Sequence, residues 1–143
     1  MVGILIVAHN GLGDSLVDCV RHVMGSTPSN LKVLSVLAED DPQRKEAEGR
    51  ALIKLLDTGK GVLILCDAFG ATPCNIAQRL HVPGRVEGVA GVNLPMLLRV
   101  VVCSSDRPLA EMAQRALDGG RECIVPMNAE PKGCNVATRC ADN

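Results

Sequence analysis

The stretch GVLILCDAFGATPCN, residues 61–75, decides the fold of this chain. Its first part, Val62 to Cys66, is a short apolar run with β-branched members and no alternation of polar side chains, which is typical of a strand buried on both faces. Thr72 and Pro73 suit the start of a helix, because a hydroxyl side chain caps the free amides and proline fits the first helical position. The stretch therefore predicts a central strand, a short loop and a helix.

Polar and aromatic side chains follow this strand directly. Asp67 is expected at the carboxyl end of the strand, facing a helix N-terminus whose amides attract anions. Ligands of open α/β sheets bind at this edge. The alternative, that Asp67 only caps the loop, stays open at this point. Phe69, the only aromatic residue of the chain, lies in the same loop, where a docking contact and a core position are both compatible with the sequence.

A second apolar run, residues 2–8, ends in the same way. It is followed by His9, Asn10 and Gly11, so His9 is also expected at the carboxyl end of a strand. Further strands are predicted at 31–36, 86–92 and 122–125. The helices between them begin after the first strand, at Asp41 and Pro42, at Thr72, near Asn93 and at Asp106 and Pro108.

Alternating strands and helices predict a single-domain, doubly wound α/β fold with a mainly parallel sheet. With the strand order 2-1-3-4, the sheet reverses its winding between the first and third strands, whose ends then lie about 4.8 Å apart. His9 and Asp67 are therefore expected to face each other at this switch point.

Composition excludes several classes of function. The chain has 143 residues, a net charge of -1, no basic run and one aromatic residue, which argues against nucleic-acid or membrane-surface binding. No apolar stretch approaches the roughly 20 residues of a membrane span, and the N-terminal residues make a poor signal peptide. Seven cysteines without a C-x-x-C pair favour reduced thiols in the cytoplasm.

The expected pair of His9 and Asp67 has a defined chemistry. A carboxylate that holds one ring nitrogen as N–H leaves the other nitrogen with a free lone pair, as in a nucleophile or a general base. The helix N-terminus with Thr72 supplies donors for an anion such as phosphate. A receiver-type phosphoacceptor at Asp67 would need acids after the first strand, where the chain has Ala8, His9 and Asn10, so the histidine is the better acceptor. We expect no metal and no cofactor.

Three blocks of sequence, in this order, resemble the IIA component of the mannose-type bacterial phosphotransferase system: IVAHNGLGDSL (6–16), LILCDAFGATPCN (63–75) and VAGVNLPMLL (89–98). The resemblance covers residues 1–125. It implies that His9 is phosphorylated and that Asp67 orients it, while Asn10, Gly70, Ala71 and Thr72 hold the phosphoryl oxygens. Asn10 stands where many members of the family have glycine.

The resemblance also implies a function and partners. We expect a cytoplasmic phosphocarrier of the sugar phosphotransferase system that accepts a phosphoryl group on His9 from the carrier protein HPr and passes it to a IIB protein, with Phe69 as a docking contact. A regulatory sensor without a transported sugar, or a small-molecule binding protein with an idle site, are the alternatives. Residues 126–143 are expected to be a flexible tail, unlike a linker and IIB domain, so we expect a stand-alone IIA protein.

The final predicted strand suggests a mode of assembly. Residues 122–125 follow Gly119 and Gly120, which we expect to form a flexible hinge, and the fourth strand leaves a sheet edge open. The last strand can fold back on its own sheet or add to that of a partner. The resemblance favours the exchanged, antiparallel arrangement, and we predict a homodimer that depends on residues 121–126.

Overall fold

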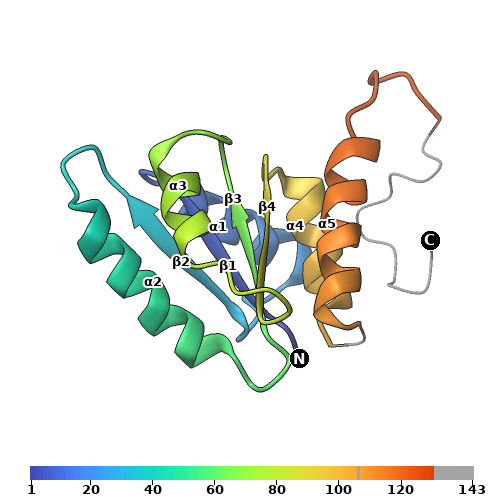
Figure 1. Ribbon diagram of the computed structural model, residues 1–143. Coiled ribbons are helices and arrows are strands. Elements are labelled where there is room, and N and C mark those ends of the chain that lie inside the picture. Colours follow the sequence, from blue (N-terminus) through green and yellow to red (C-terminus); the bar gives the residue numbers. More distant parts are fainter. Residues whose placement is uncertain (106, 131–143) are drawn as a thin grey trace.

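The computed structural model describes residues 1–105 and 107–130. Strands and helices alternate along most of this length (Figure 1). The strands are β1 (Gly3–His9), β2 (Leu31–Val36), β3 (Val62–Cys66) and β4 (Val86–Ala90), and the helices are α1 (Leu12–Met24), α2 (Pro42–Leu56), α3 (Thr72–Arg79), α4 (Leu94–Cys103) and α5 (Leu109–Glu122).

The four strands form one parallel sheet in the order β2-β1-β3-β4. This confirms the predicted α/β class and strand order. The central strands β1 and β3 pair in the register Val7 with Cys66. Because both strands are parallel and adjacent, the residues that follow them lie at the same edge of the sheet.

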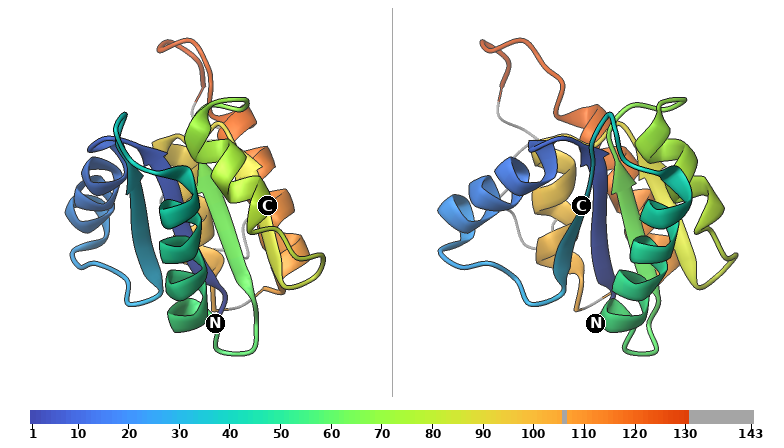
Figure 2. Two further views of the ribbon diagram at one scale, coloured as in Figure 1. Left: turned by 60° about the vertical axis from the view of Figure 1, so that its left-hand side comes forward. Right: turned by 90° about the vertical axis from the view of Figure 1, so that its left-hand side faces the viewer.

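Helices cover both faces of the sheet (Figure 2). Ile4, Ile6 and Ala8 of β1 are buried in one apolar cluster with α4 and α5, while Leu5 and Val7 are buried in a second cluster with α3 and the last residue of α2. The alternate residues of β1 thus point to two separate cores, as a fully covered central strand requires. This double burial explains the continuous apolar run in the sequence.

Several predicted boundaries shift by a few residues. Thr72 is the first residue of α3, not its N-cap; Ala71 is the N-cap, and no side chain caps this helix. The N-cap prediction for Thr72 is therefore wrong, although Pro73 does lie in the first turn. The strand predicted at 86–92 ends at Ala90, and Gly91 then turns with a φ of 90°.

The predicted hinge at Gly119 and Gly120 is wrong. Both glycines are buried inside α5, which continues to Glu122. A Cβ atom on Gly119 would lie 2.9 Å from the Arg99 side chain, and one on Gly120 would lie 2.7 Å from Met96. The two glycines therefore allow α5 to pack closely on α4. From sequence, glycine indicates the end of a helix, so this packing role could not be predicted.

The strand predicted at residues 122–125 does not form within the single chain. Glu122 ends α5, and residues 123–126 have no regular secondary structure. The folded-back alternative is thus not observed, whereas an exchanged strand needs a second chain and stays a prediction. Most of the predicted tail and Asp106, expected at the start of the last helix, lie outside the described residues.

The described cysteines differ in state. Cys19, Cys66, Cys74 and Cys123 are free, and Cys103 is disulfide-bonded, so the expectation of reduced thiols is wrong for Cys103. In the part of the chain that the structure describes, the helices are all too short or too polar to cross a membrane.

The contact between β1 and the end of α2 provides a test of the fold. A Cβ atom on Gly3 would lie 2.7 Å from the Cβ of Leu56 and 2.9 Å from the Leu56 carbonyl oxygen, which is backbone and cannot rotate away. We expect Gly3→Ala to lower the free energy of unfolding by about 1 to 3 kcal/mol, the usual cost of overpacking. Urea denaturation measures this change.

Gly11→Ala serves as the matched control, because a Cβ atom there meets nothing within 4 Å. Its φ of -89° suits any residue, and we expect a change below about 1 kcal/mol, the cost of alanine at an N-cap. Equal stability losses in the two variants would show that the Leu56 contact does not constrain the sheet.

Candidate functional site

His9 and Asp67 meet at the carboxyl edge of the sheet, as the sequence predicts. His9 is the last residue of β1, and Asp67 directly follows Cys66, the last residue of β3. Asp67 Oδ2 accepts a hydrogen bond from the backbone N–H of His9 at 2.9 Å and lies 2.7 Å from the His9 ring atom Nδ1. Asp67 Oδ1 accepts from the Ala68 N–H at 2.8 Å. The carboxylate therefore joins the ends of the two central strands.

This contact determines the tautomer of the His9 ring. An ionised carboxylate only accepts hydrogen bonds, so Nδ1 carries the proton and Nε2 of the neutral ring carries a lone pair. The His9 side chain is 48% exposed, compared with 12% for Asp67. Within residues 1–105 and 107–130, no hydrogen bond occupies Nε2. The geometry thus leaves one nucleophilic nitrogen at the surface.

The environment of Asp67 favours the ionised carboxylate. Burial is the strongest single influence on its pKa and acts to raise it, but the hydrogen bonds from the His9 N–H, the His9 ring and the Ala68 N–H together outweigh burial and lower the pKa below its ordinary value. The stabilisation from this ionised group is present above the pKa of the unfolded chain and is lost as the pH falls through the lower folded value. Asp67 is therefore anionic at neutral pH.

The backbone around the pair is suited to an anion. Asn10 has a φ of 48°, a left-handed conformation that asparagine and glycine tolerate best, and its N–H donates to the Val36 carbonyl at 3.0 Å. Asparagine at this position is therefore compatible with the left-handed backbone, which glycine would also tolerate. The start of α1 follows His9 at once, and its first amides have no acceptor within the helix.

The predicted phosphoryl-binding residues of the second loop lie at the same edge. Gly70 turns the loop with a φ of 89°, Ala71 is the N-cap of α3, and Thr72 is exposed in its first turn. Asn10 directly follows β1, and Gly70, Ala71 and Thr72 belong to the loop and helix start that follow β3. Their contacts with a phosphoryl group stay a prediction.

Apolar side chains surround this edge. Phe69 is 77% exposed, so the alternative that it belongs to the core is wrong. Leu12, at the start of α1, and Leu37, directly after β2, are each 42% exposed. Neither leucine is recognisable from sequence as a surface residue, because each adjoins an apolar pattern that a core residue would equally continue. Their only sequence signal is a position just beyond a strand or at a helix start.

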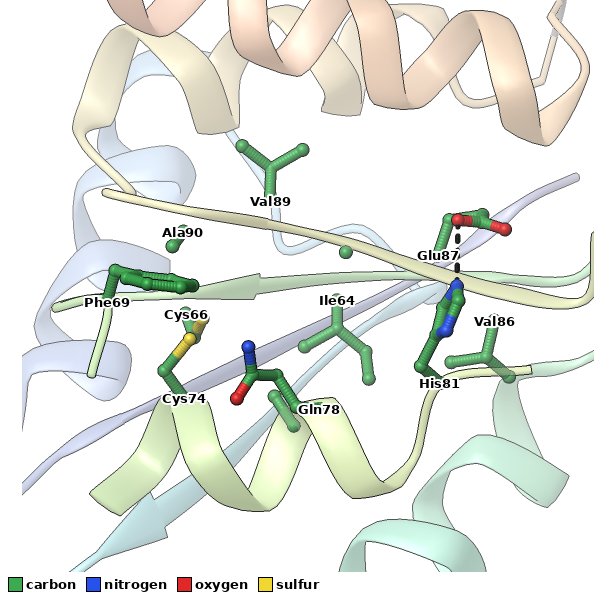
Figure 3. Close-up of a pocket in the computed structure, with 12 residues that line it drawn as sticks. Ile64, Cys66, Phe69, Cys74, Gln78, His81, Val86, Glu87, Val89 and Ala90 are labelled. Atoms are coloured by element: carbon green, nitrogen blue, oxygen red, sulfur yellow. Dashed lines mark hydrogen bonds and ion pairs between the residues drawn. The ribbon is translucent and has the colours of Figure 1, made fainter. Parts of the chain in front are cut away.

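A groove lies between α3 and β4 (Figure 3), and His9 is not among the residues that line it. Its volume is about 150 Å³, and Phe69 lies at one end of it. At the other end, His81 Nε2 lies 3.1 Å from Glu87 Oε2. The described residues contain no group of three or more histidine, cysteine or acidic side chains that could hold a metal ion.

Comparisons with known proteins agree with this geometry. The sequence matches the family EIIA-man, described as "PTS system fructose IIA component", over residues 3–117. It is 30% identical over 132 residues to the "PTS system mannose-specific EIIAB component" of Escherichia coli (strain K12), a match that covers 91% of this chain and 41% of the relative. The chain thus spans well under half the length of this relative.

Solved structures share the fold. The mannose/sorbose specific IIA subunit of the phosphotransferase system from Enterococcus faecalis superposes with a TM-score of 0.78 at 23% identity, over 90% of this chain and 96% of that one. Component EIIA from Streptococcus agalactiae gives a TM-score of 0.77 at 22% identity, over 88% and 97% of the two chains. The family match over most of the described residues shows that the chain belongs to the mannose-type IIA components of the phosphotransferase system.

Proposed function

We propose that this protein is a phosphohistidine phosphocarrier, which accepts a phosphoryl group from HPr on His9 and passes it to a IIB protein for sugar uptake. The 2.7 Å contact between His9 Nδ1 and Asp67 Oδ2 carries this proposal, since it leaves Nε2 as the exposed nucleophile. The family supports the general kind of reaction. We place the transfer in the cytoplasm, together with HPr.

The chemistry needs little more than positioning and charge compensation. The Nε2 lone pair of His9 attacks the phosphorus atom of phosphorylated HPr, and the bond from that phosphorus to the HPr histidine breaks as the new P–N bond forms. The His9 ring then carries a positive charge, which the adjacent Asp67 carboxylate stabilises through the Nδ1–H hydrogen bond. Transfer to a IIB protein repeats the same exchange in the opposite sense.

The surface around His9 suits a protein partner. The ring is half exposed, and Phe69, Leu12 and Leu37 present apolar area near it. Exposed aromatic and aliphatic side chains next to a reactive group are typical anchors of a protein interface. We propose Phe69 as the principal docking contact, since it is the most exposed of the three.

The first test concerns the acceptor residue. Incubation with phosphoenolpyruvate, enzyme I and HPr should add one acid-labile, base-stable phosphoryl group, and His9→Ala should abolish it without unfolding the protein. His22→Ala is the matched control, because His22 is an exposed histidine of α1. Labelling that persists in His9→Ala would disprove the assignment. Onward transfer to a IIB protein separates the transport role from a regulatory one.

The second test concerns Asp67. In Asp67→Asn, an NH₂ group replaces one of the two carboxylate oxygens, so only one acceptor is left. In one orientation of the amide, the NH₂ group faces the backbone N–H and the ring of His9; in the other, it faces the Ala68 N–H. The first orientation also favours the tautomer that places the proton on Nε2. We expect phosphoryl transfer to slow about a hundredfold or more, as when an orienting acid is lost. Rapid-quench measurement of transfer from phosphorylated HPr gives the rate.

Asp57→Asn is the control for this variant. Asp57 also accepts two backbone N–H bonds, from Gly59 and Gly61, but it follows α2 at the far end of the sheet, where it pairs with Arg85. It should lose stability without slowing transfer. An unchanged transfer rate in Asp67→Asn would show that Asp67 only caps the loop and does not assist transfer.

We also propose a homodimer in which the segment after α5 adds to the sheet of a second copy. β4 is an edge strand, and three apolar residues beyond α5 are strongly exposed in the single chain: Ile124 at 77%, Val125 at 50% and Met127 at 104%. Such residues combine strand-forming tendency with an uncovered apolar surface. Pairing with the free edge of β4 would bury them.

Removal of this segment should abolish the dimer. Because α5 continues to Glu122 and Gly120 packs on Met96, the chain should be cut after Cys123, which leaves the helix intact. Light scattering should then show monomers or aggregates, and the double variant Ile124→Asp, Val125→Asp in the full chain should behave alike. A full-length chain that remains monomeric at high micromolar concentration would refute the exchange.

A further inference from the structure

Two free cysteines mark the ends of the loop that carries Asp67. Cys66 is the last residue of β3, and Cys74 lies in the first turn of α3. Both are almost fully buried, at 4% and 3% exposure, in the same apolar cluster. The close-up shows their sulfur atoms beside each other on the wall of the groove (Figure 3). The proposed transfer mechanism uses neither thiol.

The two sulfur atoms lie beside each other in the apolar cluster (Figure 3). Burial is the main cause that raises the pKa of the Cys66 thiol, and the neighbouring Cys74 thiol raises it further. Both sulfur atoms are therefore close enough to interact in the reduced protein. A pair of adjacent thiols on two different elements is the arrangement from which a disulfide can form.

The groove gives a route to this pair. Cys66 and Cys74 line it together with Phe69, Gln78 and the apolar side chains of β4, and its volume of about 150 Å³ lies beside their sulfur atoms. Buried thiols react slowly when they are neutral, because the thiolate is the nucleophile. We therefore expect a reaction under sustained oxidation, with small reagents that enter between α3 and β4.

We propose that Cys66 and Cys74 form a reversible disulfide by exchange with small-molecule disulfides, and that this cross-link slows phosphoryl transfer at His9. The effect on transfer rests on the proposed function, whereas formation of the cross-link does not.

The exchange is balanced in two steps. One cysteine loses its proton, attacks a sulfur atom of the small disulfide and releases one small thiolate, which leaves a mixed disulfide on the protein. The second cysteine then loses its proton, attacks the protein sulfur and releases the second small thiolate. The two cysteines are oxidised, the small disulfide is reduced, and the two protons end on the small thiols.

The cross-link would alter the site because of what it encloses. Residues 67–73, which include Asp67, Phe69 and the start of α3, lie within the ring that a Cys66–Cys74 bond closes. An S–S bond is about 2.05 Å long, whereas unbonded sulfur atoms stay well over an ångström further apart, so bond formation must move the two buried side chains toward each other. This movement changes the packing between the end of β3 and the first turn of α3, where both side chains are buried. Asp67 adjoins Cys66, and a displacement of about 1 Å can cost a hundredfold in rate.

The test exposes the whole protein to hydroxyethyl disulfide, a small uncharged probe, and maps its peptides by mass spectrometry. We expect a linked peptide pair containing Cys66 and Cys74, reduced by two hydrogen atoms in mass, together with a shift in the NMR signals of the His9 ring. Phosphoryl transfer from HPr should fall about tenfold or more and recover on reduction.

Cys74→Ser, with Cys74→Ala as a second variant that buries no hydroxyl, is the matched control. Both retain every other cysteine, and both should keep their transfer rate under the same oxidation. Absence of the Cys66–Cys74 peptide overturns the proposal, as does a cross-linked protein with an unchanged His9 signal and rate. If the reduced protein accepts no phosphoryl group, the proposed function fails, while the peptide map and the His9 signal still test the cross-link.

Discussion

The parallel pairing of β1 and β3 is the constraint on which the rest of this structure depends. It aligns Val7 with Cys66, so that the residues following the two strands emerge side by side. One oxygen of the Asp67 carboxylate, Oδ2, then accepts hydrogen bonds from both the backbone N–H and the ring Nδ1–H of His9. The same carboxylate oxygen therefore fixes the position of the His9 backbone and the orientation of its ring.

Burial on both faces makes this arrangement rigid. β1 contributes alternate side chains to two cores, and β3 is buried along its whole length. Displacement of either strand would disturb packing on both sides of the sheet, and close-packed interiors resist such changes. The His9 ring therefore projects from a fixed base, although it is itself half exposed. Precise orientation with an open surface is what the proposed transfer between two proteins would require.

The loop between β3 and α3 serves several purposes in few residues. Asp67 orients the histidine, Phe69 extends into solvent, and Gly70 turns the chain toward the helix start. Cys66 and Cys74, at its two ends, are held in the same core cluster. The His9–Asp67 contact, the exposed Phe69 and the buried thiols are therefore connected through one short loop, and the proposed cross-link would act on His9 through this connection.

The sequence alone determined the α/β class, the strand order and the placement of His9 and Asp67 at one edge of the sheet. Apolar runs and the polar residues that end them are local sequence patterns, and neighbouring parallel strands end at the same edge. Only the tertiary structure decided the left-handed backbone of Asn10, the exposure of Phe69 and the burial of Gly119 and Gly120. Glycine signals a helix end in sequence, yet here both glycines lie inside α5 and leave room for the Met96 and Arg99 side chains of α4. Such contacts involve residues that are distant in the sequence, so no local sequence pattern predicts them.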